Sequence, residues 1–173
     1  MTNEGCYSCR LNAADGVALP IRERIFDDGN WRVVHAISSS LPGWLCVVSR
    51  RHITTLSELS AAEAEALGPL LKRLSDALER VTGALKCYVM FFAEAPGFDH
   101  LHIHVAPRLP DCPEDRLGPK LISYLGEPEE RWLSAQQMDE VAIRVRKALS
   151  EMAPVPINER SAAEERVDNP RRA

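Results

Sequence analysis

The stretch His100-Leu101-His102-Ile103-His104-Val105 decides the fold of this chain, because imidazole and branched aliphatic side chains alternate in it without a break. Strict alternation is typical of a β-strand, in which successive side chains point to opposite faces of the sheet. We therefore expect three histidines on one face and three aliphatic residues in a core on the other. The chain has five histidines in all, so three on one face favour a functional site over a chance run of polar residues. Neutral imidazole can act as a nucleophile, a proton carrier or a metal ligand near pH 7.

Length and composition predict one globular domain with a C-terminal tail. A chain of 173 residues can bury a core without disulfide bonds. Its 45% hydrophobic and 27% charged residues are typical of a globular protein. From Pro154 onward the sequence is punctuated by proline, evenly charged and poor in large apolar residues. We therefore expect a folded domain over residues 1–153 and a disordered tail over residues 154–173.

The composition also excludes some partners. A net charge of −4 argues against broad binding to nucleic acid, although a local site can still hold a small anionic ligand. No apolar run approaches ~20 residues, so we expect no membrane span. The first six residues lack the basic start and the apolar stretch of a secretory signal. We therefore expect a cytoplasmic protein, in which the five cysteines are reduced thiols rather than a disulfide framework.

Hydrophobic patterns along the chain predict an α+β fold with an antiparallel sheet of about five strands. The expected strands cover residues 24–27, 31–37, 44–49, 85–93 and 100–106, and we expect 85–93 to be buried. A capping box at Ser60 begins a long amphipathic helix over residues 60–82, and Pro69 is expected to bend it. A second helix is expected over residues 134–152.

The run His100 to Ala106 resembles the signature of the histidine triad (HIT) superfamily, His-φ-His-φ-His-φ-φ with φ apolar, at all seven positions. The resemblance extends to the segment Leu41 to His52 and the helix after it, and spans residues 6–109. It implies a HIT-like fold with one long central helix, of the zinc-bearing bacterial HIT hydrolase type. Family members of this size commonly form homodimers through that helix and the strand before the triad.

The resemblance also implies nucleotidyl transfer to water. In the family, the central histidine attacks the α-phosphorus of a nucleotide and forms a covalent nucleotidyl-histidine, which water then cleaves. That role falls on His102, while His104 would lie near the phosphate oxygens or the leaving group. Family substrates include nucleoside phosphoramidates and dinucleoside polyphosphates. Two alternatives stay open: a nucleotide-binding regulatory protein with little turnover, and a nucleotidyltransferase that uses an acceptor other than water.

The expected substrate-binding residues are Ile25, Phe26, Gly97 and His104. Ile25 and Phe26 match the positions where the family lines its nucleoside pocket, although core packing accounts for them equally well. Two departures from the family pattern stand out. Many members have a histidine after the Pro-Gly turn that acts in a relay with the triad, where this chain has Trp44. The loop over residues 93–99 also lacks the Asn, Gln and hydroxyl side chains that usually bind phosphate.

A structural zinc site is the expected cofactor site. Two cysteines with the spacing of Cys6 and Cys9 also occur by chance, and His52 alone would more often be a surface residue. Several bacterial HIT proteins and the related galactose-1-phosphate uridylyltransferases, however, hold zinc with an N-terminal Cys-x-x-Cys, a histidine at the position of His52 and the first triad histidine. The resemblance therefore implies Zn²⁺ bound by Cys6, Cys9, His52 and His100, a closed tetrahedral set typical of structural zinc.

Overall fold

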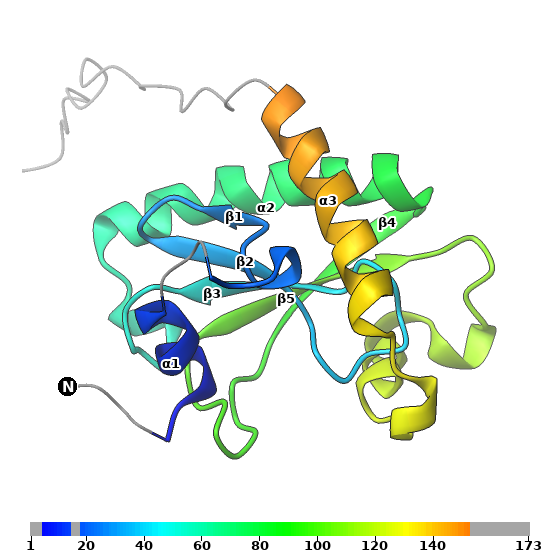
Figure 1. The fold of residues 1–173 in the computed structure, drawn as a ribbon, viewed down its shortest axis with the longest axis horizontal. Coiled ribbons are helices and arrows are strands. Elements are labelled where there is room, and N and C mark those ends of the chain that lie inside the picture. The colour runs from blue at the N-terminus through cyan, green and yellow to red at the C-terminus, as the bar shows by residue number, and fades with distance from the viewer. Residues whose placement is uncertain (1–4, 15–17, 153–173) are drawn as a thin grey trace, which may run out of the picture.

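One antiparallel sheet forms the centre of the structure, a computed structural model that describes residues 5–14 and 18–152 (Figure 1). Within the described residues the sheet has five strands in the order β1-β2-β3-β5-β4. The strands are β1 (Phe26–Asp27), β2 (Trp31–His35), β3 (Leu45–Ser49), β4 (Lys86–Phe91) and β5 (His102–Arg108). The predicted α+β class and the five-stranded antiparallel sheet are therefore confirmed.

Three α-helices of the described part of the chain pack around the sheet: α1 (Tyr7–Ala13), α2 (Ala61–Thr82) and α3 (Ala135–Glu151). The capping box predicted at Ser60 begins α2, and a second box at Ser134 begins α3. The α2 helix ends at Gly83, whose φ of 73° is the left-handed conformation that glycine adopts most easily. It continues through Pro69 as one helix. Short 3₁₀ helices connect the remaining elements, among them η1 (Ile21–Glu23) and η4 (Gly118–Leu125).

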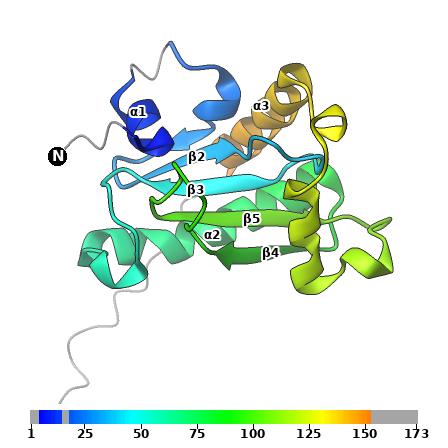
Figure 2. The same ribbon diagram turned by 90° about the horizontal axis from the view of Figure 1, so that it is seen from below.

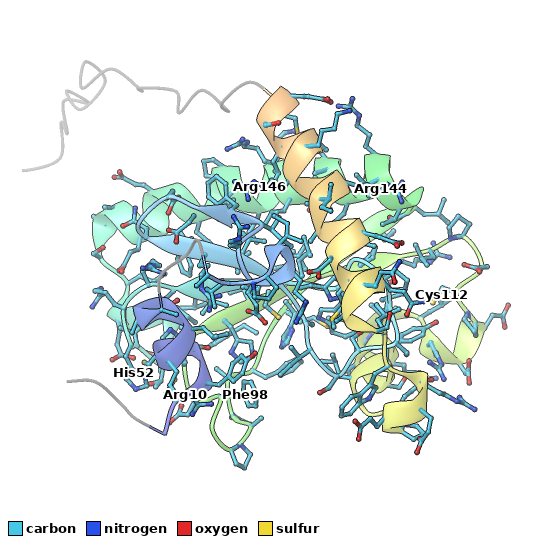
Figure 3. The ribbon with its side chains drawn as sticks, in the orientation of Figure 1. Arg10, His52, Phe98, Cys112, Arg144 and Arg146 are labelled. Atoms are coloured by element: carbon cyan, nitrogen blue, oxygen red, sulfur yellow. The ribbon has the colours of Figure 1, made fainter. Side chains whose placement is uncertain are left out.

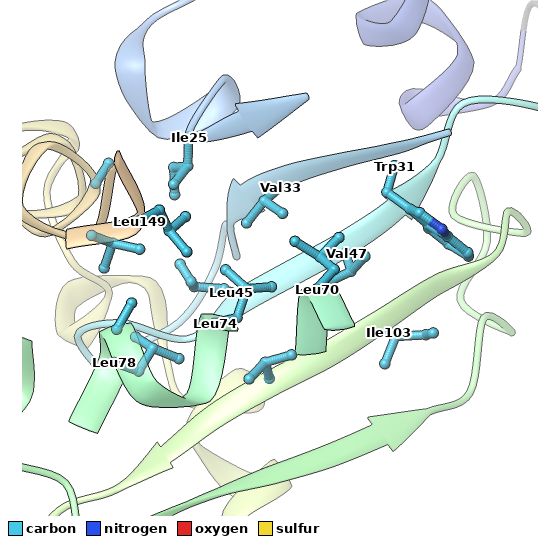
Figure 4. Close-up of a cluster of buried hydrophobic side chains, with 14 of the residues drawn as sticks. Ile25, Trp31, Val33, Leu45, Val47, Leu70, Leu74, Leu78, Ile103 and Leu149 are labelled. Atoms are coloured by element: carbon cyan, nitrogen blue, oxygen red, sulfur yellow. The ribbon is translucent and has the colours of Figure 1, made fainter. Parts of the chain in front are cut away.

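The α2 and α3 helices cover one face of the sheet and form the main core with it (Figure 4). Leu101, Ile103 and Val105 point into this core, as the alternating pattern of the triad stretch predicts. They meet the buried face of α2, where Leu70 and Leu74 recur at helical spacing. Since the imidazoles alternate with these aliphatic residues, the core fixes which face of the sheet carries His102 and His104.

The opposite face of the sheet is only partly covered by apolar side chains. A second buried cluster joins Trp44, Cys46, Val48 and Ala106 from the sheet to Leu121 of η4. Figure 2 shows α1 near one end of the strands and the segment that follows β5 near the other. The region between these two segments is where a cavity forms.

The expectation of a buried strand over residues 85–93 is wrong in its burial and too long. The β4 strand covers only Lys86–Phe91 and lies at the edge of the sheet, where it pairs with β5 alone. Leu85 and Val89 are 55% and 49% exposed as a result. The sequence of this apolar run does not reveal that the strand lies at the edge of the sheet, because that position depends on the strand order.

No helix within residues 5–14 and 18–152 is long and apolar enough to cross a membrane. The tail expected over residues 154–173 lies outside the described residues.

Candidate functional site

A cavity of about 340 Å³ lies on the sheet face opposite the main core. His102 and His104 line it from β5, and Cys46 and Val48 line it from β3. The pairing register of β3 and β5 brings these four side chains together, because Cys46 pairs with His104 and Val48 pairs with His102. Phe92 closes another side, with its ring centroid 6.3 Å from that of His104. The cavity is thus an apolar pocket with two imidazoles in its floor, the usual composition of a small-molecule site.

One hydrogen bond fixes the ring of His102. Its Nδ1 atom lies 2.8 Å from the backbone oxygen of His100. A carbonyl oxygen can only accept, so Nδ1 carries the hydrogen and donates it. The neutral ring then has its lone pair on Nε2. His102 is therefore held in the tautomer that a nucleophilic imidazole requires.

A different hydrogen bond fixes the ring of His104. The indole nitrogen of Trp44 donates to its Nδ1 atom at 3.0 Å, and the two rings are nearly perpendicular. The neutral ring then carries its hydrogen on Nε2, the reverse of His102. Burial, and next the neighbouring His102, lower the pKa of His104 to about 4. The cavity therefore faces one ring with a free lone pair and one ring with an N–H donor.

The first triad histidine lies elsewhere. His100 precedes β5, is fully buried and belongs to a cluster with Cys6, Cys9 and His52. Its Nδ1 atom lies 3.4 Å from Sγ of Cys6, 3.5 Å from Sγ of Cys9 and 3.3 Å from Nδ1 of His52. Of the three histidines expected on one face, His102 and His104 line the cavity and His100 does not. His100 turns away because its ring packs against the N-terminal helix.

The cluster has the dimensions of a metal site. Its four ligand atoms all lie within 4.8 Å of one another. Zn–N bonds of about 2.0–2.1 Å and Zn–S bonds of about 2.3 Å in a tetrahedron give ligand separations of about 3.3–3.8 Å. On its far side, Nε2 of His100 lies 2.8 Å from the backbone oxygen of Ser49. This outer bond places a hydrogen on Nε2 and presents the Nδ1 lone pair to the cluster.

A family model agrees with this geometry. The model of the HIT domain matches residues 22–111, which is more than half of the chain. The chain belongs to the HIT domain family. No curated protein matches it in sequence.

Solved structures share the fold of this HIT domain. A Zn-bound histidine triad family protein from Mycobacterium smegmatis is 20% identical, with a TM-score of 0.58 over 84% of this chain and 93% of that one. A histidine triad protein from Sinorhizobium meliloti is 22% identical, with a TM-score of 0.60 over 73% and 88%. A uridylyltransferase is 21% identical, with a TM-score of 0.61 over 87% of this chain and 47% of that one. At these identities the likeness concerns the fold.

Three of the expected substrate-binding residues do not line the cavity. Ile25 is buried in the main core, and Phe26 packs against the same core beneath the guanidinium of Arg73. Gly97 has a φ of 79°, and its backbone oxygen accepts a hydrogen bond from the amide of Tyr7 at 2.9 Å. Ile25 and Phe26 therefore serve packing, and Gly97 holds the loop before the triad against α1.

The HIT domain cavity has a polar wall that the sequence analysis missed. Tyr7 and Ser8 of α1, Glu23 of η1 and Arg32 of β2 all line it. Glu23 and Arg32 are buried and paired at 3.4 Å, and the Tyr7 hydroxyl donates to Glu23 at 3.2 Å. Burial, and next Glu23, raise the pKa of Tyr7 to about 12, so this phenol stays a donor. The sequence did contain a signal for Tyr7 and Ser8. They lie between Cys6 and Cys9, and a zinc ion shared with His100 would place them beside the triad.

His35 and Cys112 do not belong to the cysteine–histidine cluster. His35 is buried and fully bonded, because its Nδ1 atom lies 2.8 Å from the oxygen of Ala36 and its Nε2 atom accepts from Gly43. Figure 3 shows His52, Arg10 and Phe98 at the end of the molecule that carries α1, and Cys112 far from it.

Proposed function

We propose that this protein is a nucleotide hydrolase that acts on nucleoside phosphoramidates or dinucleoside polyphosphates through a covalent nucleotidyl-histidine. The observation that carries the proposal is the hydrogen bond from Nδ1 of His102 to the backbone oxygen of His100. It leaves the lone pair on Nε2 of a ring that lines the cavity. Membership of the HIT domain family supports nucleotide chemistry at this ring.

The reaction has two steps. In the first, Nε2 of His102 forms a bond to the α-phosphorus while the bond from phosphorus to the leaving group breaks, and its electron pair departs with that group. The N–H at Nε2 of His104 donates to a phosphate oxygen and stabilises the charge that develops there. In the second step water attacks the same phosphorus and gives one proton to solvent, while the bond from phosphorus to Nε2 breaks and its electron pair returns to His102.

A transferase is the second candidate. The uridylyltransferase whose fold covers 87% of this chain supports it. In that case the nucleotidyl group on His102 passes to an acceptor other than water, and the first step is unchanged. Dependence of product formation on an added acceptor separates the two candidates.

We propose Zn²⁺ as a structural cofactor held by Cys6, Cys9, His52 and His100. The donor set fits, since two thiolates and two imidazoles leave no open position for catalysis. When bound, the ion supplies a cross-link rather than reaction chemistry. It would tie α1, and with it Tyr7 and Ser8 in the cavity wall, to the residues that lead into β5.

We also keep three expectations about partners and location as proposals. A homodimer is supported by the edge position of β4, which exposes Val89, and by the exposed side chain of Phe92 directly after this strand. A small nucleotide rather than nucleic acid is supported by the net charge of −4. A cytoplasmic location is supported by the five cysteines, which as reduced thiols suit a reducing compartment.

Intact-protein mass spectrometry tests the nucleophile. Brief mixing with an adenosine phosphoramidate or diadenosine triphosphate should add one adenylyl mass to the wild-type chain. The His102→Ala variant should gain none, and its turnover should fall by at least about 10³-fold, since the covalent route is lost. An adduct that persists in His102→Ala, or turnover unchanged in it, would reject the proposal.

A further inference from the structure

Trp44 packs against His104 on the face of the sheet that carries the cavity. Trp44 is fully buried and His104 is 7% exposed. The ring centroids lie 5.7 Å apart at an angle of 88°, and the indole Nε1 atom lies 3.0 Å from Nδ1 of His104. The turn before Trp44 depends on Gly43, whose φ is 82° and whose amide donates to His35. The position of the indole is therefore set by its own backbone as well as by its contact with the imidazole.

The indole decides which nitrogen of His104 carries the hydrogen. An indole N–H is a donor and never an acceptor. If Nδ1 of His104 were protonated, two N–H groups would face each other at 3.0 Å in a buried site. The Cys46 sulfur, 3.4 Å from the same nitrogen, belongs to a thiol whose pKa burial raises to about 12, so it also presents a hydrogen. Both neighbours thus favour a lone pair on Nδ1 and the hydrogen on Nε2.

This arrangement lets His104 donate a hydrogen bond but not a proton. Giving up the hydrogen on Nε2 would leave an imidazolate anion unless Nδ1 gained a proton at the same moment. Neither the indole nor the Cys46 thiol is an acid near neutral pH. His102 cannot supply the proton either, because its Nδ1–H is bonded to His100 and its Nε2 bonds to phosphorus.

We propose that the Trp44–His104 contact selects the leaving group, so that the site cleaves phosphoric anhydrides and discriminates against phosphoramidates of alkylamines. This inference rests on the proposed function. With an anhydride, the bond from Nε2 of His102 to phosphorus forms and the P–O bond breaks. The leaving phosphate keeps the electron pair as a stable anion and needs no proton. With a phosphoramidate, the P–N bond breaks only if the nitrogen is protonated, and neither triad ring in the cavity has a proton to give.

A purely structural role for Trp44 predicts something different. A buried indole needs an acceptor for its N–H, and His104 satisfies that need whatever the substrate. Loss of packing alone would lower the turnover of every substrate by the same factor. A change in the ratio of two substrates that share one nucleotide therefore separates selection of the leaving group from packing.

The first experiment uses the wild-type protein and compares diadenosine triphosphate with an adenosine phosphoramidate of an alkylamine. We expect kcat/KM to be at least about tenfold higher for the anhydride, a small part of the 10²–10⁴ that general acid catalysis can contribute. Phosphoramidates of anilines, which leave more easily than alkylamines, should lie in between. Equal or faster cleavage of the alkylamine compound would overturn the inference.

The second experiment restores a proton carrier. Trp44→His places a ring that can hold a proton beside Nδ1 of His104, so the ratio should shift towards the phosphoramidate by about tenfold or more. Trp132→Phe is the matched control, because it removes an indole N–H bonded to the oxygen of Glu127 away from the cavity. Its ratio should equal that of the wild type. A ratio unchanged in a folded Trp44→His variant counts against the inference.

The third experiment reads the tautomer directly and does not depend on any variant. In ¹⁵N imidazole spectra of the wild type between pH 6 and pH 8, Nδ1 of His104 should have the shift of an unprotonated nitrogen. A protonated Nδ1 would contradict the inference even if the substrate ratio agreed with it. Adduct formation shows whether the proposed function fails or only the selection of the leaving group. If neither substrate nucleotidylates His102, the proposed function fails, whereas adducts formed equally from both overturn only the selection of the leaving group.

Discussion

The Nδ1 atoms of His52 and His100 lie 3.3 Å apart, although 48 residues separate the two histidines in the chain. Two imidazole lone pairs at this distance repel each other unless a proton or a cation lies between them. The Sγ atom of Cys9 lies 3.3 Å from His52 and 3.5 Å from His100. One cation at the centre can bind all these donors at once, whereas a single proton can join only two of them.

We therefore expect about one zinc ion per purified chain, measured by elemental analysis. Cys6→Ser should lower the zinc content several-fold and lower the melting temperature, since α1 loses its link to His100. Cys112→Ser is the matched control, because this thiol is also free but lies outside the cluster. Full zinc content in Cys6→Ser, or none in the wild type, would reject the site.

Ser8 should contact the nucleotide. It is 6% exposed and lines the cavity, and its hydroxyl has no hydrogen-bond partner among the described residues. Removing this hydroxyl breaks no bond within the described protein, so Ser8→Ala should change the free energy of unfolding by less than about 0.5 kcal/mol. The loss of one neutral hydrogen bond to the ligand should weaken AMP binding by about 3- to 10-fold in calorimetric titration.

The control for Ser8 is Ser150→Ala in α3, an exposed hydroxyl bonded to the oxygen of Lys147. It should bind AMP like the wild type. Zinc content should be equal in the two serine variants, so that a change at the neighbouring cysteines is not the cause. Unchanged AMP affinity in Ser8→Ala would remove this residue from the binding wall.

His104 should matter for the rate more than for binding. In the proposed reaction its Nε2–H donates to a phosphate oxygen as charge develops there, and the loss of one such donor typically costs about 10²–10³ in kcat. His104→Ala should show this loss with a much smaller change in KM. His104→Gln keeps an N–H donor and should recover part of the rate. A loss below about threefold in His104→Ala would show that this ring is not a donor to the transition state.

The stability of the protein should fall in mild acid because His35 is buried in its neutral form. Burial lowers the pKa of His35 to about 4, against about 6.5 in an unfolded chain. Between these values the unfolded chain binds more protons, so stability is full above pH 6.5 and decreases as the pH falls towards 4. From pH 7 to pH 5, His35 should account for a loss of about 2 kcal/mol.

Urea unfolding at the two pH values measures this loss, and His35→Gln isolates the share of one group. The glutamine variant should be less stable at pH 7, since the amide of Gly43 loses its present acceptor. Its further loss on going to pH 5 should be smaller than that of the wild type by about 2 kcal/mol. An equal loss in both proteins would place the acid sensitivity elsewhere.

The sequence predicted the elements well where a periodic pattern and a cap agreed. The long helix begins at Ser60 as its capping box requires, and the triad stretch buries Leu101, Ile103 and Val105 as alternation requires. The hydrophobic pattern failed to predict burial where burial depends on the position of a strand in the sheet. An edge strand and a central strand can carry similar apolar runs, so the exposure of β4 followed only from the strand order.

The features of the site also divide into those that the sequence predicted and those that only the tertiary structure decided. The sequence, through its resemblance to the HIT family, predicted the two groups of histidines and cysteines, and the structure brings Cys6, Cys9, His52 and His100 together. Which nitrogen of each ring is free, and which residues form the polar wall, depends on partners that are distant in the chain. Trp44 donates a hydrogen bond to His104, which is 60 residues away in the chain. Arg32 of β2 pairs with Val48 of β3, and Val48 pairs with His102 of β5, so the order and register of the strands place these residues side by side. Only the tertiary structure decides such contacts, because hydrogen bonds between side chains are set by sheet register and packing rather than by local sequence.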